Sequence, residues 1–163
     1  MRIKKLRKIL DSNNSFPCLI TDLTNIRYLT GFSGSNALLL IGKNKTYLIS
    51  DSRYQEYAES FLGPGFEFFL QKGSQAEALK ECTKKINEAR IFIESGNITL
   101  SQFNEIKKNL GRVKLVQTEK DYVNSLRMVK DEDEIAVLRE AALITDNCFS
   151  HLLKKIRPGI CEW

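Results

Sequence analysis

The chain has 163 residues, 42% of them hydrophobic and 28% charged, with a formal net charge of +5. This length and composition suit one globular domain with a buried core plus an appendage. No apolar run approaches the roughly 18–20 residues needed to cross a bilayer, so a membrane-spanning protein is not expected.

Residues 2–13 predict an amphipathic helix, because Ile3, Leu6, Ile9 and Leu10 fall on one side and basic residues lie between them. A secretory signal peptide would need an uninterrupted apolar stretch after its charges, and none follows. We therefore expect a surface helix of a cytoplasmic protein.

Six short apolar runs predict strands. Residues 37–41 and 46–50 are apolar at consecutive positions, which indicates strands covered on both faces, and residues 42–45 supply a hairpin turn. The other predicted strands are residues 16–21, opened by Pro17, and residues 66–70, 90–94 and 113–116.

Helices are predicted between several of these strands. Asn25 is a candidate N-cap of a helical turn over residues 25–28, and amphipathic spacing predicts helices over residues 52–62, 75–87 and 100–110. A hairpin together with helical crossovers requires a mixed sheet. The predicted fold class is therefore α/β, a mixed sheet of about six strands flanked by helices, followed by a long C-terminal helix.

A domain boundary is predicted near residue 125. Residues 1–125 form the sheet domain, residues 122–128 read as the connection, and residues 126–163 carry a helix over 131–155. The apolar side of that helix, at spacings close to three and four, must pack on something; it includes Ile135, Leu138, Ala142, Phe149, Leu152 and Ile156.

The charges and cysteines exclude further classes. The basic residues are spread over helix surfaces and not clustered between aromatics, so nucleic-acid binding is not expected. Cys18, Cys82, Cys148 and Cys161 contain no Cys-x-x-Cys pair, which removes metal-finger and redox motifs and favours reduced, structural thiols.

The Gly- and Ser-rich corner at residues 31–35 could be mistaken for a phosphate loop. A phosphate loop needs Gly-x-x-x-x-Gly-Lys-Ser/Thr between a strand and a helix, whereas this corner leads into a strand. We expect Gly31 and Gly34 to provide a positive φ or a close backbone approach.

Three carboxylates, Asp22, Asp51 and Glu94, follow predicted strands. Acids at strand ends can converge on a metal, as in ribonuclease-H-like nucleases. The simpler interpretation is that Asp22 and Asp51 cap the turns after them, and it is the one we favour.

Two segments together resemble a known family. Residues 25–54 read as a helical turn, a Gly/Ser corner, two buried strands and a helix start ending in Asp-Ser-Arg-Tyr. This order resembles the opening of the amino-terminal domain of Xaa-Pro aminopeptidases and prolidases, relatives of creatinase. Residues 129–142 and 156–162 are similar to the first helix of that family's "pita-bread" catalytic domain. The resemblance implies a ribonuclease-H-like layout of the sheet.

The resemblance also implies a function. The family hydrolyses peptides with two divalent ions, typically manganese, held by two Asp, one His and two Glu. His151 is the single histidine here and is not expected to bind metal, so this chain alone should hold no metal and no catalytic residue. In several family members the corner lies toward the cleft of a neighbouring subunit. That makes Phe32, Ser33, Ser35 and Arg53 candidates for substrate-side or subunit contacts, although Arg53 could equally be a structural ion-pair partner.

The leading hypothesis is the non-catalytic amino-terminal domain of a cytoplasmic, dimeric Xaa-Pro aminopeptidase acting on proline-containing peptides. Prolidase, which cleaves Xaa-Pro dipeptides, is the nearest alternative. A stand-alone, non-enzymatic oligomerisation or interaction domain is the alternative from a different class. The nuclease interpretation requires Asp22, Asp51 and Glu94 to lie together.

Overall fold

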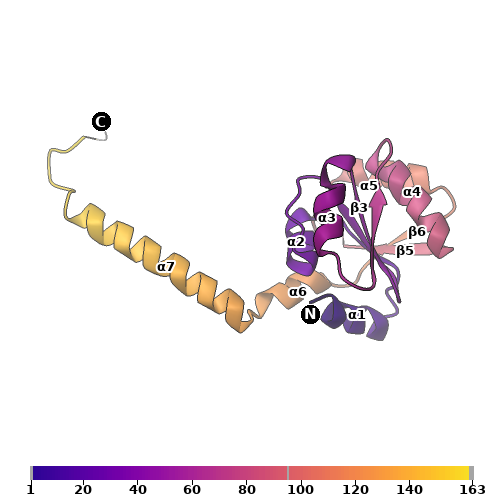
Figure 1. The fold of residues 1–163 in the computed structure, drawn as a ribbon, viewed down its shortest axis with the longest axis horizontal. Coiled ribbons are helices and arrows are strands. Elements are labelled where there is room, and N and C mark those ends of the chain that lie inside the picture. The colour runs from indigo at the N-terminus through magenta and orange to yellow at the C-terminus, as the bar shows by residue number, and fades with distance from the viewer. Residues whose placement is uncertain (1, 95, 162–163) are drawn as a thin grey trace. The chain divides into compact units, whose positions relative to one another are not determined.

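The computed structural model describes residues 2–94 and 96–161 (Figure 1). Contacts within the chain divide it into two compact units, Met1–Arg127 and Met128–Trp163. Glu162, which ends the second segment of the resemblance, lies outside the described residues. That residues 126–163 begin a catalytic domain stays a prediction.

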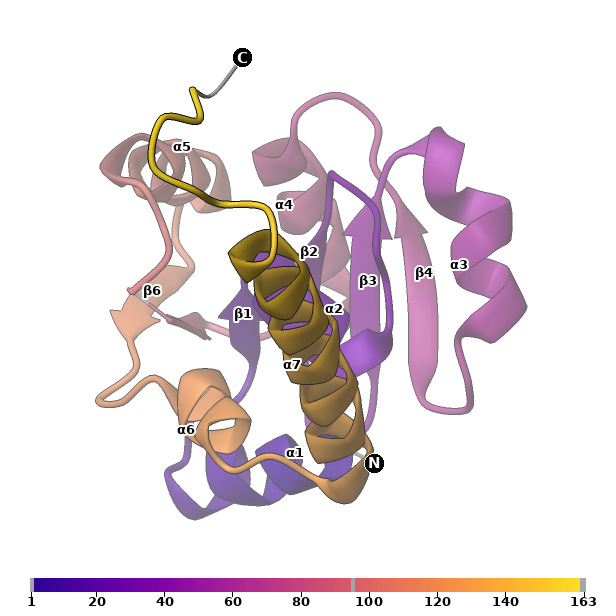
Figure 2. The same cartoon turned by 90° about the vertical axis from the view of Figure 1, so that its left-hand side faces the viewer.

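A mixed sheet forms the centre of the first unit. Its six strands are β1 (Cys18–Ile20), β2 (Leu38–Ile41), β3 (Thr46–Ser50), β4 (Phe66–Leu70), β5 (Arg90–Ile93) and β6 (Lys114–Gln117). They lie in the order β4-β3-β2-β1-β5-β6, which Figure 2 shows with β6 at the left and β4 at the right. β2 pairs antiparallel with β1 and β3, and the other neighbours pair in parallel. The predicted fold class is confirmed.

Helices cover both faces of the sheet. Those of the first unit are α1 (Arg2–Ser12), α2 (Leu23–Thr30), η1 (Ser52–Tyr54), α3 (Gln55–Phe61), α4 (Gln75–Ile86), α5 (Leu100–Leu110) and α6 (Tyr122–Met128). Side chains of α1, α2, α3 and α6 pack in one core cluster, and those of α4 and α5 pack in another on the opposite face. The first unit is thus a three-layer sandwich of helix, sheet and helix.

The central strands are buried on both sides, as their unbroken apolar runs predicted. Leu39 and Leu48 face the core under α1 and α2, whereas Leu38 and Leu40 face α4. Every residue of β2 and β3 is buried. Burying one such leucine contributes roughly 1.5–3 kcal/mol, so this hairpin anchors the sandwich.

The cap of α2 differs from the sequence prediction. Asp22, not Asn25, is the N-cap, and its Oδ1 accepts the backbone N–H of Asn25 at 2.7 Å. Asn25 lies inside the first turn with a fully buried side chain. An aspartate directly after a strand can satisfy an orphan N–H of the next helix, and the same holds for Asp51 at η1.

Two other predictions need correction. Residues 52–62 do not form one helix but a short 3₁₀ turn, η1, followed by α3. Residues 122–128, predicted as the connection, form the helix α6, whose Tyr122 and Val123 are buried in the first core cluster. The first unit therefore extends through Arg127.

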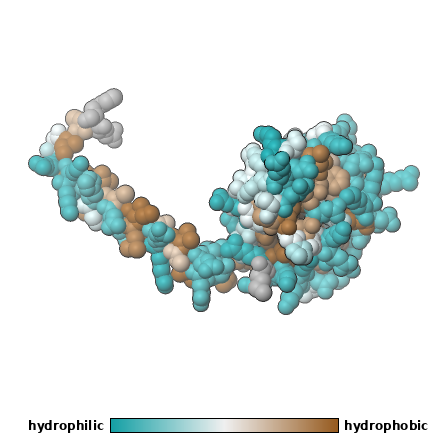
Figure 3. Space-filling model, viewed as in Figure 1, coloured by the Kyte–Doolittle hydropathy of each residue, from teal (hydrophilic) through white to brown (hydrophobic). Residues whose placement is uncertain are grey.

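The second unit consists mainly of α7 (Glu132–Leu153). Asp131 and Glu134 form a capping box at its start. None of its described residues is buried, and apolar side chains gather along the helix (Figure 3). No helix within the described residues combines the length and apolar character that a bilayer crossing requires.

Candidate functional site

The Gly/Ser corner after α2 depends on two glycines. Gly31 ends α2 with a φ of 84° and donates its N–H to the carbonyl of Arg27. Gly34 lies so close to the ring of Phe32 that a Cβ at this position would collide with it. One glycine thus serves a positive φ and the other a close approach, as the sequence predicted.

An aromatic cluster lies under the corner. Phe32 is 1% exposed and meets Tyr54 edge to face, with ring centroids 5.3 Å apart. Tyr57 lies 5.9 Å from Phe32 and 4.9 Å from Phe61. Because Phe32 is buried, it supports the corner from inside and does not present its own ring to a ligand.

Hydroxyl groups tie the corner to this cluster. The hydroxyls of Ser33 and Tyr57 hydrogen-bond at 3.1 Å, and those of Ser35 and Tyr54 at 2.9 Å. The backbone N–H of Ser35 also donates to the Tyr54 hydroxyl. These bonds from Ser35 lower the pKa of the Tyr54 phenol. The two candidate serines are therefore held by tyrosines that begin and line α3.

Arg53 is held by the carboxylate that caps η1. Its Nε and Nη2 donate to the two carboxylate oxygens of Asp51 at 2.9 and 3.0 Å, and its guanidinium lies 5.3 Å from the centre of the Tyr54 ring. The hydrogen bonds from Arg53, followed by that from Asn36, hold the pKa of Asp51 well below its ordinary value. The same pair raises the pKa of Arg53.

Arg53 nevertheless keeps an open donor. Its side chain is 68% exposed, and among the described residues its Nη1 has no hydrogen-bond partner. A guanidinium fixed on one edge and open on another suits a carboxylate or carbonyl oxygen of a ligand. A surface hollow of about 600 Å³ adjoins it, lined by Ser52, Arg53, Gln55, Glu56 and Glu59.

Asn36 connects this ion pair to the sheet. Its Nδ2 donates to Asp51 at 2.6 Å and to Gln71 at 3.0 Å, and its Oδ1 accepts from Gln75 at 2.5 Å. Its carbonyl also accepts the Ser50 hydroxyl. Asn36 was not predicted as a site residue from the sequence. The available signal was a polar amide placed between the corner and a fully apolar strand.

The structure brings all four candidates, Phe32, Ser33, Ser35 and Arg53, to one place. We call the group the corner site, and it comprises Phe32, Ser33, Ser35, Asn36, Asp51, Arg53, Tyr54 and Tyr57. It contains hydrogen-bond donors, one cation and a supporting aromatic layer, but no histidine and no cysteine. Such an arrangement can bind and orient a ligand through the hydroxyls of Ser33 and Ser35 and the guanidinium of Arg53.

The three strand-end carboxylates do not converge. Asp22 and Asp51 cap α2 and η1, as the simpler interpretation predicted, and Glu94 is buried at the end of β5. Across residues 2–94 and 96–161, no three His, Cys, Asp or Glu side chains gather where they could hold a metal ion. The nuclease interpretation loses its structural basis.

The remaining sequence candidates lie elsewhere. His151 is exposed on α7. Cys18 and Cys82 are buried and Cys148 and Cys161 exposed, all as free thiols. Burial raises the pKa of Cys82 to about 12, so this thiol stays protonated and inert.

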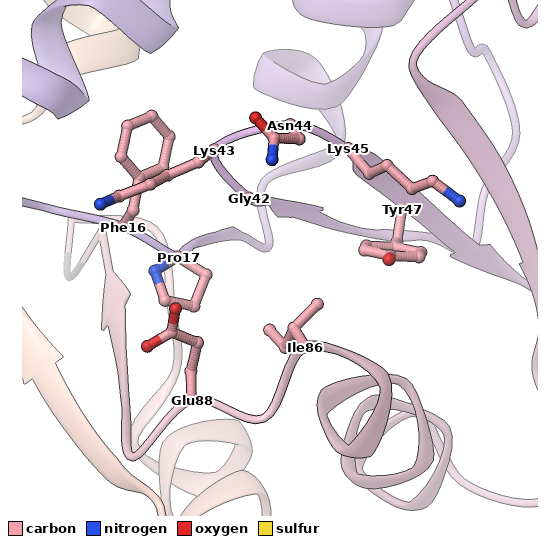
Figure 4. A pocket seen from close by; sticks show the side chains of 9 residues that line it. All are labelled: Phe16, Pro17, Gly42, Lys43, Asn44, Lys45, Tyr47, Ile86 and Glu88. Carbon is pink, nitrogen blue, oxygen red and sulfur yellow. The ribbon is translucent and has the colours of Figure 1, made fainter.

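A second pocket lies at the opposite end of the strands, beside the turn between β2 and β3. It has a volume of about 390 Å³ and is formed by the hairpin turn, the start of β1 and the end of α4 (Figure 4). Figure 4 shows Pro17, Tyr47, Ile86 and Glu88 around the hollow, with Lys43 and Lys45 along its rim. None of the corner-site residues lines it.

Comparisons with known proteins agree with the fold. Residues 2–129 match the family model of the creatinase/prolidase N-terminal domain, and the chain belongs to this family. An uncharacterized peptidase of Bacillus subtilis, YqhT, is 33% identical over 162 residues, which are 99% of this chain and 45% of that protein.

Solved structures show the same architecture. A Bacillus anthracis Xaa-Pro dipeptidase superposes with a TM-score of 0.90 at 30% identity, covering 99% of this chain and 44% of that one. An X-Pro aminopeptidase from Thermotoga maritima gives a TM-score of 0.79 at 28% identity, covering 97% and 45%. The N-terminal domain of the cytoplasmic peptidase PepQ from Mycobacterium tuberculosis gives 0.66 at 29%, covering 77% and 97%. The chain thus spans less than half the length of its full-length relatives.

Proposed function

We propose that this chain is the non-catalytic amino-terminal domain of an Xaa-Pro aminopeptidase. In this proposal the complete polypeptide releases an amino-terminal residue that precedes proline. Support comes from the family match and from the likeness to the T. maritima X-Pro aminopeptidase. The observation that carries the proposal is the corner site, whose Ser33, Ser35 and Arg53 are held in place by hydrogen bonds to Tyr57, Tyr54 and Asp51.

The metal ions of the proposed hydrolysis do not fit this chain. The family resemblance implies two divalent ions, and manganese is the proposed metal. The described residues offer no group of three His, Cys, Asp or Glu side chains that could hold even one ion. In this proposal the metal ligands are supplied by residues of the complete polypeptide that lie outside this chain.

The corner site has a binding role in this proposal. Arg53 would donate from Nη1 to a carboxylate or carbonyl oxygen of a proline-containing peptide, and Ser33 and Ser35 would line the approach. In this proposal the corner completes the cleft of another domain or of a neighbouring subunit. We also propose that the complete enzyme is a dimer. The free thiols of this chain support a cytoplasmic location.

A second candidate is a prolidase, which cleaves Xaa-Pro dipeptides. The observation in its favour is the B. anthracis Xaa-Pro dipeptidase, whose structure superposes with the TM-score of 0.90. The two activities differ in how the cleft treats residues beyond proline. An assay with substrates of different lengths therefore separates the two candidates.

The test compares the complete polypeptide with the 163-residue chain. Since 162 residues are 45% of YqhT, the reading frame should continue for about 200 further residues. With manganese, cobalt or zinc, the complete protein should release the first residue from an Xaa-Pro tripeptide, and the 163-residue chain should release none. Cleavage restricted to dipeptides would select the prolidase candidate. Hydrolysis by the 163-residue chain, or a reading frame that stops after Trp163, would contradict the proposal.

A further inference from the structure

The pocket beside the turn between β2 and β3 has the volume and the lining of a small-molecule site. Its volume is about 390 Å³, near the lower end of the roughly 300–1,000 Å³ typical of ligand pockets. Such sites combine apolar walls with a few polar groups that orient the ligand. Both kinds of group occur here, on segments far apart in the sequence: Phe16, Pro17, Gly42, Lys43, Asn44, Lys45, Tyr47, Ile86 and Glu88.

The apolar walls of this pocket are held by the sheet and by α4. Pro17 directly precedes β1, and its carbonyl accepts the backbone N–H of Phe92 on β5 at 2.8 Å. Tyr47 lies within β3 and is 6% exposed. Ile86 is the last residue of α4. The walls are therefore preformed, and a ligand does not have to order them when it binds.

A phenol hydroxyl opens into the pocket. Across residues 2–94 and 96–161, the one fully buried polar side-chain atom without a hydrogen-bond partner is Nε of Arg7. The Tyr47 hydroxyl has no partner within the same residues, so it must reach solvent, and the pocket is the surface that Tyr47 lines. This hydroxyl offers a ligand both a donor and an acceptor.

Two charges of opposite sign flank the apolar walls. Lys43 in the turn and Glu88 after α4 are exposed, and neither belongs to an ion pair in the described part of the chain. Figure 4 shows both on the side of the hollow where Pro17 lies. Lys45 points away from the hollow in this view and pairs with Glu67 at 3.1 Å. The pocket thus presents one available cation and one available anion beside an apolar wall.

This pair of charges selects one class of ligand. A purely anionic ligand such as inorganic phosphate would be repelled by Glu88, and a purely cationic ligand would be repelled by Lys43. A ligand that carries both a carboxylate and an ammonium group satisfies both side chains. An aliphatic side chain on the same ligand would be removed from water by the apolar walls.

We propose that this pocket binds a free amino acid with an aliphatic side chain, its carboxylate bonded to Lys43 and its ammonium group to Glu88. The aliphatic side chain lies against the walls formed by Pro17, Tyr47 and Ile86. This site goes beyond the proposed peptidase function, because it shares no residue with the corner site. Its occupation needs neither a metal ion nor peptide hydrolysis, so the 163-residue chain is sufficient to test it.

The experiment follows the backbone amide shifts of Gly42, Lys43 and Asn44 in the isotope-labelled chain while leucine is added. These shifts should saturate with a dissociation constant on the order of 1 mM, as suits a small ligand with a few polar contacts. N-acetylleucine lacks the cation and leucinamide lacks the anion, so each should bind about fivefold more weakly. Glycine, which lacks the aliphatic side chain, should give no saturable shift over the same concentrations.

Two variants test the charged contacts. Lys43→Gln and Glu88→Gln should each weaken leucine binding about fivefold, because each removes one charge that the ligand meets. Lys107→Gln and Glu105→Gln, at exposed positions on α5, are the matched controls and should bind leucine as the wild type does. Amide shifts outside the turn show whether each variant keeps the fold.

Several results would overturn the site. They are the absence of saturable shifts with leucine, equal binding of leucine and its two analogues, and a loss of affinity in the α5 controls as large as in the pocket variants. Leucine-dependent shifts centred on the corner site and not on the turn would contradict the proposal as well.

Discussion

Arg53 donates two parallel hydrogen bonds to the Asp51 carboxylate, from Nε at 2.9 Å and from Nη2 at 3.0 Å. The same carboxylate accepts the backbone N–H of Arg53 and so caps η1. The turn after β3 and the direction of the guanidinium are therefore set by one side chain. This geometry fixes one edge of the Arg53 guanidinium and leaves Nη1 without a partner among the described residues.

Replacing Arg53 by alanine in the complete polypeptide should lower kcat/KM for tripeptides about tenfold or more, because one charge-assisted hydrogen bond to substrate is lost. Stability should change little, since surface pairs of this kind contribute little. Peptidase kinetics and thermal unfolding, measured on the same preparations, check both statements.

Arg112→Ala is the matched control for this substitution, because Arg112 is an exposed arginine outside the corner site. Its kinetics should match the wild type. Unchanged kinetics in Arg53→Ala together with a lowered melting temperature would identify Arg53 as structural.

The stability of the first unit should fall as pH rises from 4.5 to about 7. In this range the unfolded chain loses the Glu94 proton and the folded chain keeps it. The full shift corresponds to on the order of 3 kcal/mol. Urea unfolding between pH 4.5 and 8 should show this slope in the wild type and a flat profile in Glu94→Gln.

Asp51 should act with the opposite sign, at lower pH. Its folded pKa lies below the ordinary 3.8, so its contribution to stability is present above that value and is lost as pH falls further. Asp51→Asn should leave the profile above pH 4.5 unchanged and flatten only the acid limb. A changed slope near pH 6 in Asp51→Asn would contradict this assignment.

Gly34→Ala should destabilise the domain by about 1–3 kcal/mol, because the new Cβ would collide with the ring of Phe32 and displace it from the aromatic cluster. Gly63→Ala is the control, since a Cβ at Gly63 meets nothing within 4 Å. That substitution should be neutral or slightly stabilising. Urea unfolding of both variants tests this prediction. Equal losses of unfolding free energy in the two variants would show that the corner is not tightly packed.

The 163-residue chain should form dimers through α7. Leu138 is 55% exposed and Phe149 60% exposed in the helix, a large apolar surface to leave in water. Antiparallel pairing would set Leu138 against Leu152 and Ala142 against Phe149, and it would bring the acidic first turn near the basic residues that follow the partner's helix. Thr145, midway between Leu138 and Leu152, would meet its own copy at the centre, and this small polar side chain weakens the seam.

Sedimentation of the whole chain beside a version ending at Met128 tests this pairing. The cut belongs after α6, because ending at Ser125 would divide that helix. The long form should dimerise and the short form should not. Leu152→Glu in the long form should restore the monomer. A monomeric wild-type chain would contradict pairing through α7.

The sheet was predictable because its strands are apolar without interruption. The bounds of β3, β4 and α5 agree with the predicted ranges. α6 was missed because it is short and its buried pair, Tyr122 and Val123, shows no helical period of its own. Tertiary contacts, among them the bond from Val123 to Glu94, decide its conformation.

The corner site was only partly predictable. Phe32, Ser33, Ser35 and Arg53 were singled out through the family resemblance, and the structure brings them together. Asn36 and Gln71 were missed because their partners lie 15 to 39 residues away in sequence, and a polar network of that span leaves no local pattern.

The two ends of the sheet should tolerate insertions differently. Since the other five strands run parallel to one another, their carboxyl ends open at one edge, where Asp51, Gln71 and Glu94 lie. The opposite edge carries the hairpin turn and the pocket of Figure 4. A peptide tag or fluorophore inserted between Lys43 and Asn44 should therefore report on the domain while leaving its polar edge untouched.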